Sequence, residues 1–231
     1  MKTIGLIGGM SWESTASYYR ALNQEIKTQL GGLHSAKIAL YSVDFSEIET
    51  LQHQGEWNKT ADILGNAARA VEAAGADFFL ICTNTMHKVA PQISQHVAIP
   101  LLHIADATAQ QLKTNGISKV GLLGTKFTME QEFYKGRLQD NFNIEVIVPN
   151  EHDRNIIHQV IYDELCLSEI KATSRQHYLD IIDKLFNEGA QAVILGCTEI
   201  ALLINQNDTD VPLFDTTSIH AQKAVEYALT Q

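Results

Sequence analysis

Two short segments place potential proton-transfer groups directly after apolar runs. The segment "CTNTMH" at 82–87 follows "DFFLI", and the segment "CTE" at 197–199 follows "AVILG". A deprotonated thiol is a base that works near neutral pH, and hydroxyl and amide groups donate hydrogen bonds to carboxylates. We therefore expect the two segments to hold a small carboxylic acid and to move a proton.

Helical patterns follow both segments, so backbone N–H groups and the positive end of a helix dipole would favour a bound carboxylate. The same field would lower the pKa of a thiol, which makes Cys197 a candidate base. His87 is either a proton carrier or a locally hydrogen-bonded helix residue. Cys166 lies at helical spacing from Ile161 and Leu165, which favours packing in the core.

Short runs rich in Ile, Val and Leu alternate with longer helical patterns along the chain. Such continuous apolar strands separated by helices are typical of parallel sheets covered on both faces. Gly75 and Gly189 each follow a helical pattern, as glycines at helix C-termini do. The expected strands are 3–8, 37–43, 77–82, 100–103, 118–123, 144–148, 191–195 and 212–214. The expected helices include 14–29, 56–75, 105–115, 129–140, 153–165 and 170–188.

The two halves of the chain resemble each other. Three segments recur in the same order: 4–10 matches 120–126, 75–85 matches 189–199, and 99–108 matches 211–221. This recurrence indicates an internal duplication, in which Thr198 corresponds to Thr83 or to Thr85, depending on one inserted residue.

The duplication predicts an α/β protein with two pseudo-symmetric three-layer lobes and mainly parallel sheets. We expect residues 1–104 with 211–231 to form one lobe and residues 105–210 to form the other. A ligand cleft would lie between them, beyond the carboxyl ends of the strands.

The composition argues against several other classes of function. The chain has 231 residues, a net charge of -10 and no dense basic run, which argues against nucleic acid as a partner. Its apolar runs are too short to span a bilayer, and its N-terminus lacks the apolar length of a signal peptide. We therefore expect a cytoplasmic protein that does not bind membranes. The three cysteines form no CxxC pair, the histidines form no zinc-ligand pattern, and no dinucleotide, phosphate-loop or GxSxG motif occurs. We therefore expect neither disulfides nor a metal.

With these residues in view, the chain resembles the aspartate/glutamate racemase family. "LICTNTMH" and "VILGCTEI" are similar to the two signature segments of that family. "IGLIGGMSWEST" and "GGLHS" resemble the beginning of its cytosolic amino-acid racemases, and "SVDFSEIE" and "LLGTKFTMEQEFYKGRL" fit as well. The resemblance covers essentially the whole chain. Glu199, after Cys-Thr, resembles the aspartate racemase branch, because glutamate racemases usually have His there.

The resemblance implies a cofactor-independent amino-acid racemase with one proton-transfer residue on each face of the substrate Cα, and without pyridoxal phosphate. Cys197 would be one of these residues. The substrate carboxylate gains enediolate character as the α-proton leaves, and hydrogen-bond donors would stabilise it. The implied partners are the amino-acid substrate and a second chain in a homodimer. The implied substrate-binding residues are Met10, Gln52, Asn84, Thr85, Thr125 and Thr198, with Thr125 as the counterpart of Met10.

The chain departs from the family at the first signature, where most members have Cys directly before Asn. Here Thr83 holds that position and Cys82 lies one residue earlier. Successive residues that leave a strand point in opposite directions. If the backbone follows the family path, Thr83 faces the substrate and Cys82 faces the core. If the extra residue forms a bulge, Cys82 turns into the site instead. We favour Thr83 as the partner of Cys197.

The sequence allows more than one substrate and more than one reaction. Asp163 and Glu164 are acidic where relatives often have a basic residue for a distal carboxylate, so neutral polar amino acids join aspartate and glutamate as candidate substrates. With Cys197 as the one unambiguous active-site cysteine, a decarboxylase or cis-trans isomerase of small diacids on the same fold is the second interpretation. A weakly catalytic ligand-binding protein is the third.

Overall fold

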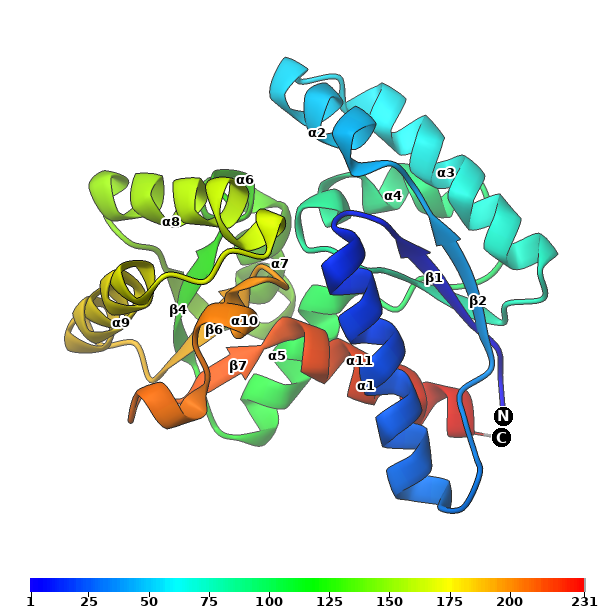
Figure 1. Cartoon of the computed structure of the whole chain (residues 1–231). Helices are drawn as coiled ribbons and strands as arrows, with labels where there is room; N and C mark the ends of the chain where they lie inside the picture. Colours follow the sequence, from blue (N-terminus) through cyan, green and yellow to red (C-terminus); the bar gives the residue numbers. More distant parts are fainter. Residues whose placement is uncertain (231) are drawn as a thin grey trace. The chain divides into compact units, whose positions relative to one another are not determined.

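The computed structural model describes residues 1–230, which divide into two compact units (Figure 1). Unit 1 comprises Met1–Ile104 and the C-terminal residues from His220 onward, and unit 2 comprises Ala105–Ile219. Residues 211–219, which we expected in the first lobe, therefore lie in unit 2. The reason is that β7 (Leu213–Asp215) pairs with β6 (Ala192–Gly196) at the edge of the second sheet.

Unit 1 contains a parallel sheet in the order β2 (Ile38–Ser42), β1 (Ile4–Gly8) and β3 (Phe78–Ile81). β1 and β3 are buried along their whole length, as expected for apolar strands covered on both faces. Their side chains alternate between the two faces of the sheet. One cluster contains Ile7, Phe79 and Ile81, and the other contains Ile4, Leu6, Phe78, Leu80 and Cys82.

Helices cover both faces of this sheet. The cluster around Ile7 includes side chains of α2 (Phe45–Gln54), α3 (Trp57–Ala73), the 3-10 helix η1 (Thr85–Val89) and α4 (Ala90–Ser94). The cluster around Leu6 includes side chains of α1 (Trp12–Leu30) and of α11 (Thr216–Leu229).

Unit 2 contains a parallel sheet in the order β5 (Glu145–Ile147), β4 (Lys119–Gly124), β6 and β7. Its largest core cluster joins Leu123, Val193 and Leu195 of the sheet to apolar side chains of the surrounding helices. The helices and 3-10 helices are α5 (Ile104–Thr114), α6 (Lys126–Glu130), α7 (Glu132–Phe142), α8 (Glu151–Asp163), η2 (Leu165–Leu167), α9 (Ala172–Asn187), α10 (Ile200–Leu203) and η3 (Gln206–Asp208). The expectation of an α/β protein with parallel sheets is confirmed.

The two sheets repeat one topology. In each unit the first strand lies inside the sheet, between the second and the third. The position of β7 is matched in unit 1 by a single parallel bridge between Phe79 and Leu101. The Phe79 N–H donates to Pro100 O at 3.0 Å, and the Val193 N–H donates to Pro212 O at 2.9 Å. The recurrence of this contact supports the internal duplication.

The helix ends repeat as well. Gly75 follows α3 with φ 90°, and Gly189 follows α9 with φ 96°. Their N–H groups donate to Glu72 O and Phe186 O respectively. Both glycines thus supply the left-handed residue that ends a helix, as the sequence predicts.

Several element predictions need correction. The segment 129–140 is not one helix, because Gln131 has extended dihedral angles and separates α6 from α7. The segment 100–103 forms one bridge rather than a strand, since α5 begins at Ile104. Helices α2, α4, α10 and α11 were not among the expected helices. α2 begins with Asp44, whose side chain accepts a hydrogen bond from Ser46 N, which is a start signal readable in the sequence.

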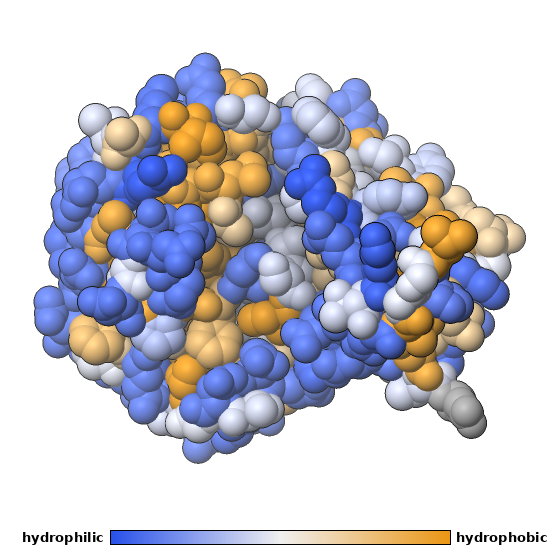
Figure 2. Space-filling view, turned by 60° about the horizontal axis from the view of Figure 1, so that its bottom comes forward, coloured by the Kyte–Doolittle hydropathy of each residue, from blue (hydrophilic) through white to orange (hydrophobic). Residues whose placement is uncertain are grey.

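The surface is largely polar. Figure 2 shows hydrophilic residues over much of the visible face, with smaller hydrophobic patches between them. Within residues 1–230, no helix combines the length and the apolar character that a membrane span requires.

Candidate functional site

Cys197 lies at the end of β6 and is 9% exposed. Gly196 precedes it at a point where the backbone has no room for a side chain, because a Cβ there would lie 2.7 Å from Leu123 O. The Cys197 thiol donates to Glu199 Oε2 at 3.0 Å, and the Thr198 hydroxyl donates to the same oxygen at 2.7 Å. Glu199 is 3% exposed. One buried carboxylate oxygen therefore accepts two hydrogen bonds from the segment that we expected to move a proton.

The pKa of Cys197 contradicts our expectation. Burial, and next the Glu199 carboxylate, raise the pKa of this thiol well above its ordinary value, whereas we expected a helix N-terminus to lower it. The helix that follows, α10, has only 4 residues, so its dipole is small. Cys197 is therefore a thiol at neutral pH in the protein without substrate, and Glu199 lies where it can accept the proton.

We call residues 82–85, which follow β3, the first elbow, and residues 197–199, which follow β6, the second elbow. In the first elbow, Cys82 and Thr83 have different surroundings. Cys82 is fully buried in the cluster around Leu6, and burial raises the pKa of its thiol far above the ordinary value. Its backbone continues the alternation of β3, with no bulge, since Cys82 N donates to Ile7 O at 2.9 Å. Thr83 follows as a half-buried residue. Of the two backbone paths considered above, the structure has the one in which Cys82 faces the core.

The registers of the two sheets define which elbow residues correspond. Ile81 pairs with Ile7 in unit 1, and Leu195 pairs with Leu123 in unit 2. Glycine follows both Ile7 and Leu123. Two residues beyond the paired positions lie Thr83 and Cys197. By the same count, Asn84 corresponds to Thr198, and Thr85 to Glu199. The sequence match of Thr198 with Thr83 or Thr85 was therefore wrong by one residue in either form.

Side chains hold both carbonyl groups of the first elbow. The Ser14 hydroxyl donates to Cys82 O at 3.0 Å, and His87 Nδ1 donates to Thr83 O at 2.8 Å. The elbow thus has a fixed backbone although Thr83 itself is partly exposed.

The loop between β1 and α1, which contains Gly9, also differs from the prediction that Met10 corresponds to Thr125. Ser11 caps α1 and accepts from Ser14 N, and Thr125 caps α6 and accepts from Thr128 N. Thr125 therefore corresponds to Ser11 and not to Met10. The loop before α1 is longer by Gly9 and Met10, and a Cβ on Gly9 would lie 2.1 Å from Val43 O.

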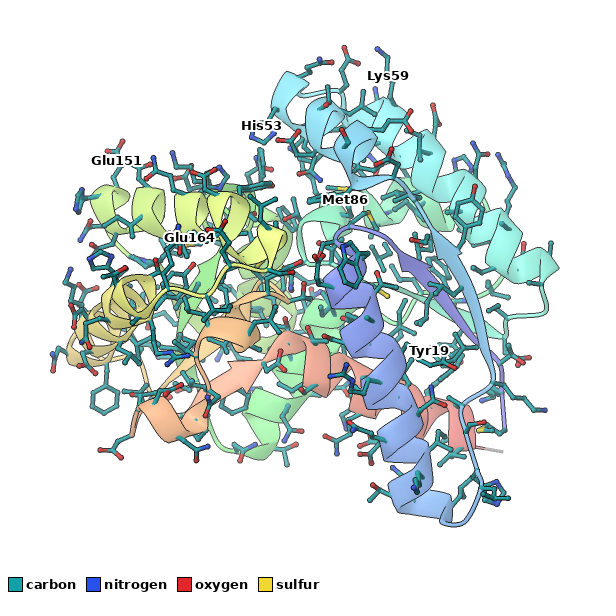
Figure 3. The ribbon with its side chains drawn as sticks, in the orientation of Figure 1. Tyr19, His53, Lys59, Met86, Glu151 and Glu164 are labelled. Atoms are coloured by element: carbon teal, nitrogen blue, oxygen red, sulfur yellow. The ribbon has the colours of Figure 1, made fainter. Side chains whose placement is uncertain are left out.

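The remaining predicted binding residues are buried within their own units. In unit 1, Met10 and Met86 belong to one cluster, and Gln52 Nε2 lies 3.8 Å from Met86 Sδ; Figure 3 labels Met86. In unit 2, Thr125 follows Gly124, which pairs with Gly196, so Thr125 and Cys197 leave neighbouring strands. The exposed fractions are 3% for Met10, 4% for Gln52, 2% for Asn84, 6% for Thr85, 5% for Thr125 and 7% for Thr198.

Comparisons with known proteins identify the family. Residues 7–224 match the family model described as Asp/Glu/Hydantoin racemase. The chain belongs to this family. A crystal structure from Yersinia pestis, assigned as an Asp/Glu racemase, is 59% identical over 100% of both chains, with a TM-score of 0.93. An aspartate racemase homologue from Pyrococcus horikoshii is 37% identical over 100% of both chains, with a TM-score of 0.86. A broad specificity amino-acid racemase from Bacillus subtilis is 23% identical over 96% of both chains.

As a member of the Asp/Glu/Hydantoin racemase family, the protein is an isomerase of the amino-acid racemase type. Within residues 1–230, no group of three or more His, Cys, Asp or Glu side chains is arranged to hold a metal ion. Sequence reasoning noticed Glu199 as a branch marker but not as the acceptor for Cys197. It also missed Ser14, whose position in the first turn of α1 gave no sign of a contact with a residue far along the chain.

Proposed function

We propose that the protein is a cofactor-independent racemase of polar amino acids, in which Cys197 and Thr83 transfer protons on opposite faces of Cα. The observation that carries this proposal is the register correspondence of Thr83 with Cys197. A racemase must be able to remove or return a proton on either face, and a duplicated fold supplies two corresponding residues for that task. The proposal requires the two elbows to approach the same substrate.

The Cys197 thiol passes its proton to Glu199, and the resulting thiolate takes the α-proton. The electron pair left on Cα spreads into the substrate carboxylate, which Asn84, Thr85, Thr198 and neighbouring backbone N–H groups would stabilise. The Thr83 hydroxyl donates its proton to the opposite face and regains one from water, and Glu199 gives its proton to the hydroxide that this leaves, so that both residues return to their starting state. In the reverse reaction, water protonates Glu199, the hydroxide formed takes the Thr83 proton, and the Thr83 oxygen accepts the α-proton.

The substrate class follows from the acidic residues near the end of α8. Glu164, labelled in Figure 3, accepts from Ser174 Oγ at 2.7 Å and lies 3.4 Å from Lys171 Nζ. Its neighbour Asp163 is exposed. The Lys171 ammonium at this point is already paired with the Glu164 and Glu169 carboxylates, so we propose that neutral polar amino acids are accepted beside aspartate and glutamate. The names of the relatives, an aspartate racemase homologue and a broad specificity racemase, fit this range.

A one-cysteine decarboxylase or cis-trans isomerase of small diacids is the second candidate. The observation that favours it is the burial of Cys82 in the core, which leaves Cys197 as the elbow thiol. Such an enzyme needs a proton donor on one face only. From the family resemblance we also expect a cytoplasmic homodimer, and light scattering coupled to size-exclusion chromatography would measure the assembly.

The deciding experiment incubates the protein with L- and D-amino acids in D2O and follows the α-proton by NMR and the enantiomers by chiral chromatography. Exchange with inversion supports the racemase. Carbon dioxide release or a double-bond shift in a small diacid, without inversion of any amino acid, supports the second candidate. Binding without any reaction contradicts both.

Variants test the roles of the two residues at the second elbow. We expect Cys197→Ala and Glu199→Gln each to reduce kcat/KM by about 10²- to 10⁴-fold, the range for loss of a general acid–base group. The matched control is Glu145→Gln, because Glu145 is exposed on β5 and pairs only with Lys119 among the ion pairs found. Wild-type activity in Glu199→Gln would exclude this carboxylate as the proton acceptor.

A further inference from the structure

Three buried histidines of unit 1 form a cluster next to the first elbow. His87 is 2% exposed, His103 9% and His220 0%. The ring centroids of His87 and His103 lie 4.5 Å apart, and those of His87 and His220 lie 6.2 Å apart. They come from η1, from the segment before α5 and from α11, so the cluster joins three parts of the sequence.

The two hydrogen bonds of the His87 ring fix its tautomer. Nδ1 lies 2.8 Å from Thr83 O, and a carbonyl oxygen can only accept, so Nδ1 carries the proton. Nε2 accepts from Ile104 N at 3.3 Å, and a backbone N–H can only donate, so Nε2 carries none. A protonated imidazole would place N–H against N–H at Ile104, which opposes ionisation.

His220 also binds the segment 102–104, through the Leu102 carbonyl. Its Nε2 donates to Leu102 O at 2.8 Å, and its Nδ1 accepts from the Tyr18 hydroxyl at 2.8 Å. Two imidazoles thus bind Leu102 and Ile104, while His103, between them in sequence, packs against His87. Ile104 is the last residue before the chain enters unit 2, and His220 is the first after it returns.

We propose that His87 is a positioning residue: its neutral Nδ1–H tautomer holds the Thr83 carbonyl and ties the first elbow to residues 102–104, where the chain leaves unit 1. This assignment excludes His87 as a proton carrier for the substrate, because both ring nitrogens are engaged by backbone groups. The effect of His87 on the rate rests on the proposed racemase function, whereas the assignment of its tautomer does not.

The tautomer is tested directly on the wild-type protein by ¹⁵N NMR of the histidine rings. We expect His87 to show a protonated Nδ1 and an unprotonated Nε2, unchanged between pH 6 and 8. A protonated Nε2, or a ring that titrates in this range, would overturn the assignment. This measurement needs no turnover, so it stands whether or not the protein racemises any amino acid.

The positioning role is tested by a series of variants with partial replacements. His87→Asn places an amide N–H near Nδ1 and keeps the donor to Thr83 O, His87→Gln places its amide near Nε2, and His87→Phe removes both. We expect His87→Phe to slow racemisation in both directions by roughly 10- to 100-fold, mainly in kcat, because a misplaced reacting group costs about that much. His87→Asn should recover most of the rate and His87→Gln should not. The control is His177→Asn on the exposed face of α9.

Solvent exchange separates positioning from general damage. With Thr83 misplaced, Cys197 can still exchange the α-proton of the enantiomer that it serves, so deuterium incorporation without inversion should persist in His87→Phe within about twofold. Equal loss of exchange and inversion, with circular dichroism showing a folded protein, would contradict the proposal. So would wild-type racemisation in His87→Phe. A wild-type protein without racemisation would instead count against the proposed function, and the NMR result would then decide the role of His87 alone.

Discussion

Thr83 and Cys197 occupy the same position of a repeated fold, each two residues beyond a strand residue that pairs with the first strand of its unit. Their side chains differ strongly as acids, because a hydroxyl releases its proton far less readily than a thiol. Their neighbours differ too, since Glu199 accepts from Cys197, whereas the residue that corresponds to Glu199 in unit 1 is Thr85.

This inequality predicts that Thr83 limits the reaction. We expect Thr83→Cys to raise racemisation at least about tenfold in both directions, because the equilibrium constant is one and a thiol is the better acid–base group at this position. Chiral chromatography of the product measures the rate. Cys82→Ala is the matched control: it should cost about 1–2 kcal/mol of stability through a lost core contact, without changing the rate. A Thr83→Cys variant no faster than wild type would show that the chemistry of residue 83 is not limiting.

The raised pKa of Cys197 predicts the pH dependence of the rate. The thiol must lose its proton before it can act as a base, and its pKa in the free protein lies well above the ordinary value. Because the thiol passes this proton to Glu199 within the site, we expect kcat/KM to stay level across the neutral range, within about twofold, instead of rising with pH. Steady-state kinetics at fixed ionic strength measure this profile. A rise of about tenfold per pH unit would mean that the thiol loses its proton to solvent and not to Glu199.

His220 predicts a loss of stability at mildly acidic pH. Burial, and next the neighbouring His87, lower its pKa to about 3, while its bond to Leu102 acts the other way. Between this value and the ordinary pKa of about 6.5, the unfolded chain binds the proton and the folded protein does not, so stability falls as the pH decreases. From pH 7.5 to 5.5 the contribution lost is roughly 1.4 kcal/mol.

Urea unfolding at both pH values measures this loss. His220→Gln should be less stable at pH 7.5, because it disturbs the bonds to Tyr18 and Leu102, but its stability should depend on pH more weakly than that of wild type. If both proteins lose the same stability between the two pH values, His220 is not the group responsible.

The glycine before Cys197 predicts a steric effect. A Cβ at Gly196 would lie 2.7 Å from Leu123 O and 2.8 Å from Leu122 Cδ1, so the strand end must shift to accept it. We expect Gly196→Ala to cost about 1–3 kcal/mol, the range for overpacking, and to reduce racemisation because Cys197 moves. Gly136→Ala, in the middle of α7, would bring its Cβ nearest to the Glu132 and Asp140 side chains, no closer than 3.2 Å, and should stay within about 1 kcal/mol of wild type. Thermal unfolding and the racemase assay compare the two variants.

The sequence predicted the parts of this molecule that depend on local pattern. Apolar runs identified the sheet strands to within one or two residues, and Gly75 and Gly189 end their helices as expected. The boundary near 210 was misplaced because the membership of β7 depends on pairing with β6, which no local pattern records. The pKa of Cys197 was predicted in the wrong direction for a similar reason: burial and the orientation of Glu199 are properties of the folded chain. The alternation of side chains along β3 did distinguish Cys82 from Thr83, because it is itself a local property.

Glu199, the single carboxylate among the elbow residues, makes the two elbows unequal in charge. Two equal elbows would offer a zwitterion two equivalent orientations, with its ammonium group toward either one. Glu199 is buried and acidic, while its counterpart Thr85 is neutral, so the α-ammonium group of a bound amino acid would gain more from Glu199 than from Thr85. We expect an amino acid to bind in one orientation, with its side chain always on the same side of the line that joins these two groups. Under the proposed function, the duplication supplies the pair of proton-transfer residues, and the one charge that was not duplicated sets the orientation of the substrate.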